Sequence, residues 1–344
     1  MTFPAVTSAT FMGPLPADLP ARVCSRAREA DIDTARSGNT ITLELSHARA
    51  RLEPSPDGLR VELAATDVNT LQSIRDFLLH LMDHVAPGAA LSRGWSDGTT
   101  RRRRPANFCT ATLRGVRRIA PRFLRVEMAC ADTARLAAGR GMHFALLLPP
   151  AGRVPVWPML DASGRTVMPG GDDTLHRAPY TFVDLDAASG TFSFDVFEHD
   201  GGRTTTWART AKPGAVVGLS GPGSGDFPPG RNVLMAGDET ALPAIRRILA
   251  ESPAERQGTV ILEVGTEQDI TPLPRPEGVA LSWLVRARGE TLWDKLSLAD
   301  PPVGPDRFVW IAAEKELIRK AKARFCGDLG VGRAEGYFAY YWER

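Results

Sequence analysis

The sequence predicts a multidomain α+β and α/β protein with a small α+β domain at residues 1–98, an antiparallel β-barrel at residues 106–228, and an α/β domain with a parallel sheet at residues 229–344. Three patterns carry this prediction. In the first part, segments in which apolar and polar residues alternate are followed by one segment with apolar residues at helical spacing. Short strands separated by turns mark the second, and alternation of strands and helices marks the third. A chain of 344 residues is long enough for two or three domains.

The first part should contain strands at 41–45, 48–52 and 59–63, where apolar and polar residues alternate. Asp57-Gly58 favours a hairpin turn between the last two strands. After Asp67, a plausible N-cap, apolar residues recur at helical spacing until Pro87-Gly88 ends the helix.

The segment that follows contains four consecutive arginines, Arg101 to Arg104. They could attract an anionic partner, but charge runs resist burial, so a solvated linker is the preferred interpretation. The barrel strands are expected at 124–128, 144–149, 192–196 and 215–219, the last of them ending at a Gly-Pro turn.

The third part should contain strands at 232–236, 259–264, 280–285 and 307–312. Helices are expected from Thr240 to Glu251 and from Glu314 to about Leu329. Alternation of this kind is typical of a parallel sheet covered by helices.

Composition excludes several functional classes. A net charge of +2 gives no general reason to expect nucleic acid as a partner. No apolar run is long enough to span a membrane, and the N-terminus lacks the pattern of a secretory signal, so a cytoplasmic protein is expected. The four cysteines are widely separated without a CxxC pair, which indicates free thiols and no resident metal site.

The most informative segment is the turn Gly237-Asp238-Glu239-Thr240, between an apolar strand and an amphipathic helix. Such a turn places a crevice at the carboxyl end of a strand. Its two acids can stabilise the start of the helix, but they would oppose a pyrophosphate placed there. Phosphates of a pyridine nucleotide would instead meet Thr240, Thr266 or nearby arginines such as Arg286 and Arg288. Whether the acids exclude an electron donor, position one or only start the helix stays open.

Several motifs, taken in order, resemble the siderophore-interacting proteins, the FAD-dependent ferric-siderophore reductases. They are Arg177-Ala178-Pro179-Tyr180-Thr181, the segment His199 to Ala208, Gly221-Pro222-Gly223, the turn from Gly237 to Ile245, the segment Val309 to Glu314 and the closing Tyr341-Trp342. The resemblance covers about residues 110–344, and the turn is its most specific element. A barrel followed by an α/β domain is also the order found in flavin reductases of the ferredoxin-reductase type. The first part resembles a small domain of unknown function seen in proteins of iron uptake.

The resemblance implies that Tyr180 lies against the isoalloxazine ring of FAD and that Thr181 bonds the ring near its redox-active nitrogen. It also implies a set of further cofactor contacts: Arg177, His199, Gly202, Arg203, Thr204, Thr205, Trp207, Gly237, Asp238, Glu239 and Thr240. Small residues and hydroxyls in the loop 202–207 would let backbone amides approach the pyrophosphate. Structural roles compete with these: packing for Tyr180 and Trp207, a β-strand for the threonines, and a satisfied imidazole for His199.

The chain departs from the family at two arginines. The family arginine two residues before the tyrosine is Ala178 here, and a second one is replaced by Val183. Arg177 stands one residue further away, and Arg203 could supply a bidentate contact to phosphate. FAD is still the expected cofactor.

The function that the resemblance implies is cytoplasmic reduction of a ferric siderophore with release of Fe(II), with NAD(P)H or ferredoxin as the electron donor. Basic residues such as Arg286, Arg288 and Lys315 are expected to attract an anionic ferric complex. Two alternatives stay open. One is a general NAD(P)H-dependent flavin oxidoreductase with another acceptor, and the other is a siderophore-binding or iron-sensing protein without turnover.

Overall fold

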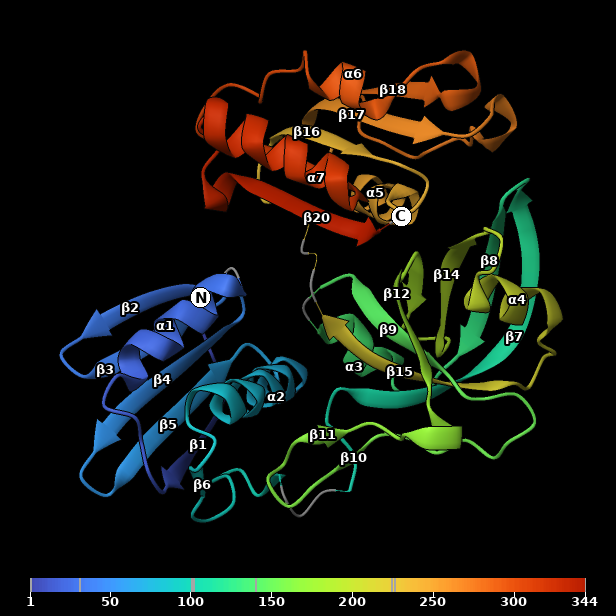
Figure 1. Cartoon of the computed structure of the whole chain (residues 1–344). Helices are drawn as coiled ribbons and strands as arrows, with labels where there is room; N and C mark the ends of the chain where they lie inside the picture. The colour runs from blue at the N-terminus through green and yellow to red at the C-terminus, as the bar shows by residue number, and fades with distance from the viewer. Residues whose placement is uncertain are drawn as a thin grey trace.

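The computed structural model describes residues 2–30, 32–99, 103–139, 141–223, 225 and 227–343. The described strands form three large sheets, one in each predicted part of the chain, and one two-stranded hairpin (Figure 1). The predicted fold class is confirmed. The domain limits at 98, 106 and 229 stay a prediction. Of the arginine run, Arg101 and Arg102 lie outside the described residues.

The first sheet is antiparallel, with strand order β2-β3-β4-β5-β1-β6, and it shares one hydrophobic core with two helices. Its elements are β1 (Ala5–Met12), α1 (Leu19–Glu29), β2 (Asp33–Ser37), β3 (Thr40–Glu44), β4 (Ala48–Ser55), β5 (Gly58–Ala65), α2 (Val68–Val85) and β6 (Ala90–Leu91).

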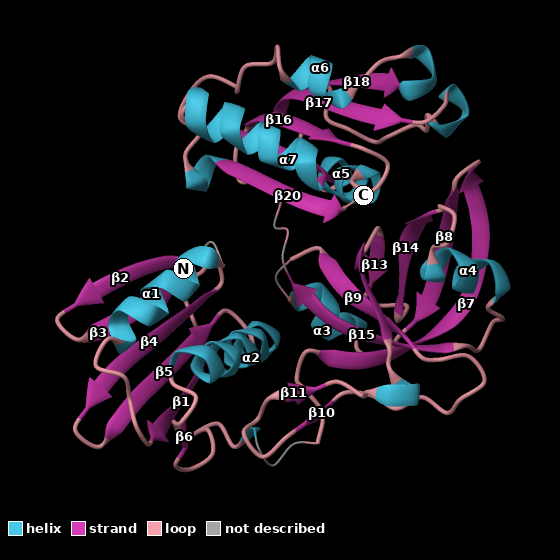
Figure 2. Cartoon of the chain, viewed as in Figure 1, coloured by secondary structure: helices cyan, strands magenta, loops and turns pink. Residues whose placement is uncertain are grey.

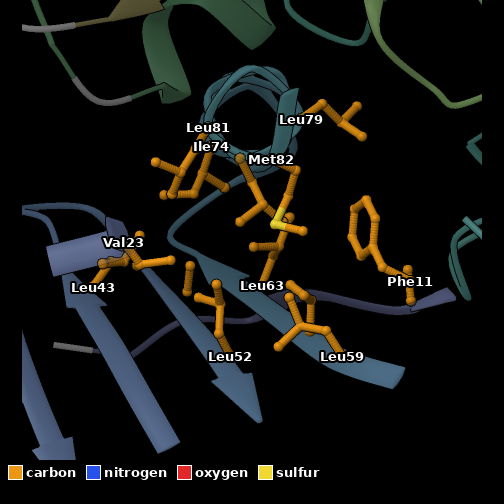
Figure 3. Close-up of a cluster of buried hydrophobic side chains, with 14 of the residues drawn as sticks. Phe11, Val23, Leu43, Leu52, Leu59, Leu63, Ile74, Leu79, Leu81 and Met82 are labelled. Atoms are coloured by element: carbon orange, nitrogen blue, oxygen red, sulfur yellow. The ribbon is translucent and has the colours of Figure 1, made fainter. Parts of the chain in front are cut away.

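Local signals explain most of this sheet. The carboxylate of Asp67 accepts hydrogen bonds from the backbone N–H groups of Asn69 and Thr70, which confirms the predicted N-cap. The apolar stripe of α2, with Ile74 and Met82, packs onto the strands (Figure 3). Strand β1 and helix α1 were not predicted, because the buried face of β1 includes Thr7 and therefore gives a weak hydrophobic alternation.

The second sheet has seven antiparallel strands in the order β12-β9-β15-β7-β8-β14-β13. Its elements are β7 (Phe108–Ala120), β8 (Phe123–Ala129), α3 (Thr133–Ala138), β9 (His143–Leu148), the hairpin β10 (Met159–Leu160) and β11 (Thr166–Val167), β12 (His176–Thr181), β13 (Asp184–Asp186), β14 (Thr191–Phe197), α4 (Arg203–Thr210) and β15 (Val216–Gly223).

This sheet curls into a barrel. The rings of Tyr180 on the edge strand β12 and Phe194 on β14 lie 5.0 Å apart, so strands far apart in the sheet order face each other across the core. Two local predictions were wrong. Strand β15 does not end before Gly221-Pro222 but continues to Gly223. The three threonines 204–206 lie in helix α4 and form neither the expected loop nor a strand.

The third sheet has five parallel strands in the order β18-β17-β16-β19-β20. Helices cover both faces (Figure 2), since α5 and α7 belong to different hydrophobic cores. The elements are β16 (Asn232–Gly237), α5 (Leu242–Ala250), β17 (Gln257–Val264), β18 (Val279–Val285), α6 (Leu292–Leu296), β19 (Arg307–Glu314), α7 (Lys315–Lys322) and β20 (Gly336–Trp342).

The topology of this sheet fixes where a crevice lies. Strand β16 pairs with β17 on one side and β19 on the other, so the strand order reverses between β16 and β19. Ligands bind at the carboxyl ends of strands at such a switch point. Helix α5 begins at Leu242 rather than Thr240. The last helical run begins with α7 at Lys315 and continues as a π-helix from Ala323 to Asp328, close to the predicted end at Leu329. Strand β20 was not predicted.

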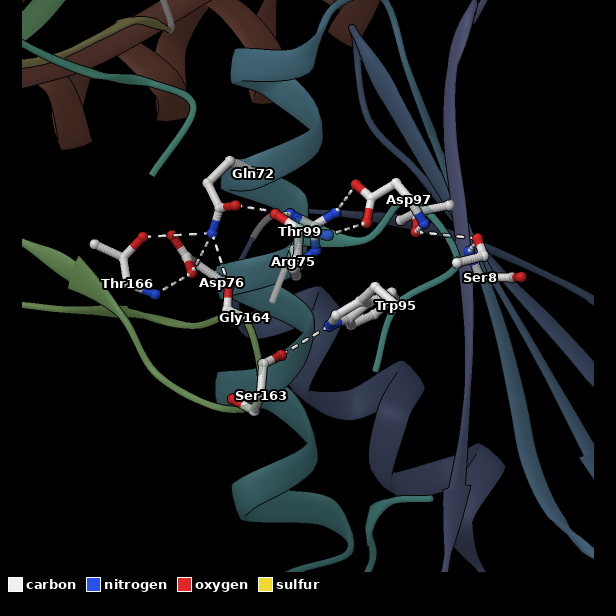
Figure 4. Close-up of polar contacts among 12 residues, drawn as sticks. Ser8, Gln72, Arg75, Asp76, Trp95, Asp97, Thr99, Ser163, Gly164 and Thr166 are labelled. Atoms are coloured by element: carbon white, nitrogen blue, oxygen red, sulfur yellow. Dashed lines mark hydrogen bonds and ion pairs between the residues drawn. The ribbon is translucent and has the colours of Figure 1, made fainter. Parts of the chain in front are cut away.

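Helix α2 joins the first sheet to the barrel (Figure 4). The backbone N–H of Thr166 donates to Asp76 at 2.8 Å, and Gln72 Nε2 donates to the carbonyl of Gly164 at 3.0 Å. Behind them, Arg75 is buried against Trp95 and forms an ion pair with Asp97 at 2.6 Å. The first domain is therefore held to the barrel by buried polar contacts.

The fold also brings together two cysteines that are far apart in the sequence. The sulfurs of Cys109 and Cys130 lie 3.9 Å apart in the barrel core, and a carboxylate oxygen of Asp132 lies close to both. The hydrogen bond between the two sulfurs, together with burial, raises the pKa of the Cys109 thiol, and the same bond lowers the pKa of Cys130. Wide spacing in the sequence therefore did not mean separation in space.

Candidate functional site

A cavity of about 450 Å³ lies where the barrel meets the carboxyl ends of the parallel strands. The barrel contributes β12, the end of β14 and His199. The α/β domain contributes Glu239, Thr240 and the last residues of β20. All four tyrosines of the chain line it: Tyr180, Tyr337, Tyr340 and Tyr341. Aromatic faces gathered in one concave site are suited to a planar conjugated ligand.

Strand β12 presents different residues to two cavities. Ala178 and Tyr180 line the cavity described above, whereas Arg177 lines a second cavity of about 570 Å³ between the barrel and α2. Residues two apart on a strand share a face, and residues three apart do not. The shift of the arginine by one residue therefore turns it away from the cavity that Tyr180 lines.

His143 connects the two domains at the cavity. Its Nδ1 lies 3.0 Å from the hydroxyl of Thr181 on the barrel, and its Nε2 lies 2.9 Å from the hydroxyl of Tyr341 on β20. Burial and the positive charge of Arg247 lower the pKa of His143 to about 4. The imidazole is thus neutral at physiological pH. Burial also raises the pKa of Tyr341 well above its usual value.

Helix α4 begins beside the cavity at Gly202. Among the described residues no side chain caps its N-terminus, and Thr204 and Thr205 are buried there. The hydroxyl of Thr204 lies 3.4 Å from His176 Nε2. Burial, together with nearby Arg203, lowers the pKa of His176. Uncapped N–H groups, a hydroxyl and a guanidinium at a helix N-terminus can hold a phosphate.

Of the other predicted residues in this segment, His199 lines the cavity, and the side chain of Trp207 packs against the barrel core. A Cβ at Gly202 would lie 2.8 Å from the hydroxyl of Thr205 and 2.9 Å from Nε2 of His199, so a larger residue there would have to displace these two side chains.

The acids of the central turn are fully engaged. Asp238 accepts hydrogen bonds from the backbone N–H of Thr240 at 2.9 Å and from Trp342 Nε1 at 2.8 Å, and burial raises its pKa. Neither Asp238 nor Glu239 caps α5, whose N-cap is Ala241. Simple helix capping therefore does not explain them: Asp238 fastens β20 to the turn. Gly237 is needed for close packing, because a Cβ there would lie 2.8 Å from the carbonyl of Ala312.

The predicted substrate-binding cations are all paired. Arg286 forms ion pairs with Glu239 and Glu263. Arg288 pairs with Glu267, and Lys315 pairs with Glu343 at 2.8 Å. Of these three cations none lines the cavity; only Lys315 approaches it, with its ammonium 5.9 Å from the ring centre of Tyr340.

Sequence reasoning missed His143, His176, Tyr337 and Tyr340, and it named Tyr341 only as part of the closing family motif. A lone histidine in a strand gives no signal, and only the fold places His143 beside Thr181. The aromatic-rich segment from Tyr337 to Trp342 was a usable signal for a strand, because aromatic residues favour strands.

These residues fit a flavin. Tyr180 and Thr181 lie at the barrel edge, aromatic side chains surround the cavity, and the uncapped N-terminus of α4 lies beside His199. The fit lacks an arginine on the cavity face of β12, where Ala178 stands. The positive charge for a phosphate group would come instead from the N-terminus of helix α4 and from the guanidinium of Arg203.

The fold belongs to the ferredoxin-reductase class. It is similar to the cytochrome b5 reductase domain of Ulva prolifera nitrate reductase, with 15% identity, a TM-score of 0.50, and coverage of 70% of this chain and 98% of that one. A family model described as the siderophore-interacting FAD-binding domain matches residues 112–226, and the model of the siderophore-interacting protein matches residues 230–344. The chain therefore belongs to the siderophore-interacting protein family.

Two solved structures support this assignment. The siderophore-interacting protein SipS from Aeromonas hydrophila is 25% identical, with a TM-score of 0.59 over 71% of this chain and 92% of that one. A siderophore utilization protein from T. fusca is 28% identical, with a TM-score of 0.58 over 70% and 95% of the two chains.

The curated relatives match a smaller share of this chain than the solved structures do. The ferric vibriobactin reductase ViuB of Vibrio cholerae is 30% identical over 172 residues, which are 48% of this chain and 64% of that protein. The mycobactin import ATP-binding/permease protein IrtA of Mycobacterium tuberculosis is 28% identical over 181 residues. The chain spans about a fifth of the length of IrtA, since the match covers 21% of that protein. No described helix of this chain has both the length and the apolar character needed to cross a membrane.

Proposed function

We propose that this protein reduces ferric siderophores in the cytoplasm with FAD as its cofactor, and so releases Fe(II) for iron acquisition. The observation that carries the proposal is the cavity where Tyr180 and Thr181 of an FAD-binding barrel meet the aromatic strand β20. The similarity to a ferric vibriobactin reductase supports the same reaction. When bound, FAD supplies electrons that can pass singly to a ferric centre.

The chain's own residues position the reacting partners. Tyr180 is held at the barrel edge by contacts with Phe144 and Phe194, which gives a ligand a rigid face to pack against. The hydroxyl of Thr181 is fixed by neutral His143, so no mobile positive charge accompanies it. Tyr341 and Trp342 are fastened from the other domain and cover the cavity from that side. Asp238 therefore acts as a positioning residue through Trp342.

We propose Gly202, Arg203, Thr204 and Thr205 at α4 as the contacts for the FAD pyrophosphate, with His199 lining the same cavity. Arg177 is left out of this set because it lines the other cavity. The electron donor is NAD(P)H or a ferredoxin. Glu239 at the switch point would repel the phosphates of a dinucleotide bound against this turn. This arrangement favours a donor that does not place phosphates there.

The first experiment is the absorbance spectrum of the purified protein, followed by anaerobic photoreduction and addition of ferric chelates of several classes. We expect flavin bands, and reoxidation when a ferric chelate is added. A flavin that no ferric chelate reoxidises would refute the proposed function. The variant Thr181→Val should lower flavin affinity about two- to tenfold, as expected for one lost hydrogen bond. Thr112→Val, on an exposed position of β7, is the matched control.

The two alternatives give different results in the same assay. A general flavin oxidoreductase would oxidise NAD(P)H rapidly with quinones or free flavins and show no preference for iron chelates. A binding or sensing protein would be colourless when purified and would still bind ferric chelates.

A further inference from the structure

The charged side chains that line the cavity are all acidic. Two carboxylates, Asp195 and Glu239, line it, and no lysine or arginine does so among its described residues. The remaining lining is aromatic, aliphatic or neutral, including Tyr340 and Trp342 near solvent. This is the opposite of the basic lining expected for an anionic substrate.

The carboxylate of Glu239 belongs to a group with a net negative charge. Arg286 contacts both Glu239 and Glu263, with Nη1 3.0 Å from Glu239 Oε2 and 2.6 Å from Glu263 Oε1. Two carboxylates thus share one guanidinium, so one negative charge is left over. Glu239 is itself buried, which limits screening by salt.

The negative charge of the second lining carboxylate, Asp195, is neutralised by nearby arginines. Arg125 holds Asp195 in a bidentate ion pair with distances of 2.8 and 3.0 Å, and it also reaches Asp184. Arg246 lies within electrostatic range of the same group. The excess charge at the cavity therefore comes from the Glu239 side. At the mouth, Lys315 is neutralised by Glu343.

We propose, as a refinement that rests on the function proposed above, that Tyr180 and Thr181 hold the flavin on the barrel side of the cavity, while the α/β side, with Glu239, Tyr340 and Trp342, faces the ferric chelate. This side accepts uncharged or cationic ferric chelates of the hydroxamate type and discriminates against tris-catecholates. Three hydroxamates cancel the charge of Fe(III), whereas three catecholates leave a large negative charge on the complex. A trianion brought beside Glu239 is repelled, and a pendant ammonium is attracted by both the carboxylate and the exposed aromatic faces.

The test uses ligands that share one metal-binding backbone and differ in the charge of a single terminal group. A linear trishydroxamate with one free amine gives a cationic complex, its N-acetyl derivative a neutral one, and its N-succinyl derivative an anionic one. Gallium(III) complexes of these have the same shape as the ferric ones but accept no electron, so calorimetric titration of the FAD-loaded protein measures binding without turnover. We expect Kd to rise by about two- to fivefold per unit of negative charge in low salt, and the differences to shrink in high salt.

Three variants locate the source of the effect. Glu239→Gln should flatten the dependence of Kd on ligand charge. Glu263→Gln should also flatten the dependence of Kd on ligand charge, because Glu263 pairs with the same guanidinium as Glu239. Glu263 does not line the cavity, so this variant changes the charge without changing a ligand contact. Glu44→Gln, which makes the same change in an exposed ion pair of the first domain, should leave the dependence unchanged.

The outcomes separate the two proposals. An anionic gallium complex that binds as tightly as the cationic one, or a charge dependence that survives both Glu239→Gln and Glu263→Gln, overturns the charge discrimination. If the photoreduced protein reduces ferric chelates while this happens, the proposed function stands and only the substrate class is wrong. If no ferric chelate of any charge is reduced, the proposed function itself fails.

Discussion

His143 is the residue whose replacement tests the site most directly. We consider the variant His143→Gln, whose side chain does not titrate. In the wild type, the buried imidazole bridges Thr181 and Tyr341, and its pKa is lowered to about 4 from an ordinary value of 6.5. Between these values the unfolded chain binds a proton at this position that the native protein does not bind. Stability is therefore lost as the pH falls from 6.5 towards 4.

The magnitude follows from that difference. Complete titration of His143 would remove about 3 kcal/mol of stability, and the loss between pH 7 and pH 5 is about 2 kcal/mol. At pH 7 the glutamine variant should be less stable by about 1–3 kcal/mol, because at least one buried hydrogen bond is lost. On acidification to pH 5 this gap should shrink by about 2 kcal/mol, since only the wild type contains the titrating group.

Urea titrations of both proteins at pH 7 and pH 5 measure the gap. Histidine labelled with carbon-13 gives a second readout: the resonance that disappears in His143→Gln should not titrate between pH 8 and pH 5. His84→Gln, an exposed histidine on α2, is the control and should follow the pH dependence of the wild type. Equal pH dependence of wild type and His143→Gln, or a His143 resonance that titrates near pH 6.5, would refute the reasoning.

Four further outcomes are expected. Ala178→Arg should tighten flavin binding, because it restores a cation on the face of β12 that carries Tyr180. Arg177→Ala should change the flavin Kd by less than about twofold, because Arg177 lines the other cavity. Equilibrium dialysis measures both dissociation constants, and equal effects of the two variants would contradict the assigned faces. Asp76→Ala should cost about 2–4 kcal/mol and speed proteolysis between the first domain and the barrel, because buried donors lose their acceptor. Arg165→Ala should cost under about 1 kcal/mol in urea unfolding, because its ion pair is largely exposed. Arg75→Met should cost about 2–4 kcal/mol in thermal unfolding, and an unchanged melting temperature would show that its ion pair is not needed.

The sequence predicted the fold well where periodicity was strong. The apolar stripe and Asp67 predicted α2, and four parallel strands were placed to within about two residues. Strand β1 and helix α1 were missed because their buried faces contain few large apolar residues. Strand β20 was missed because its segment from Gly336 to Trp342 contains no alternation of polar and apolar residues.

The candidate site was only partly predictable. Tyr180 and Glu239 are signalled by local motifs, and the fold brings both to one cavity. The pairing of Arg286 with Glu239 joins residues 47 positions apart, so no local pattern could show that this cation is already neutralised. The same holds for His143 and Tyr341, which are 198 positions apart. Contacts between strands of different sheets depend on the packing of domains, which short-range spacing does not encode.

The hydrogen bonds of His143 have a consequence for the direction of protons in the site. A neutral imidazole carries one N–H and one lone pair, so it can donate to only one of its two hydroxyl partners and must accept from the other. The row Thr181–His143–Tyr341 can therefore be ordered in two directions, and switching between them reverses all of its hydrogens without changing the net charge. Whether Thr181 can turn its own hydrogen toward a bound ligand thus depends on which way Tyr341, in the other domain, turns its hydrogen.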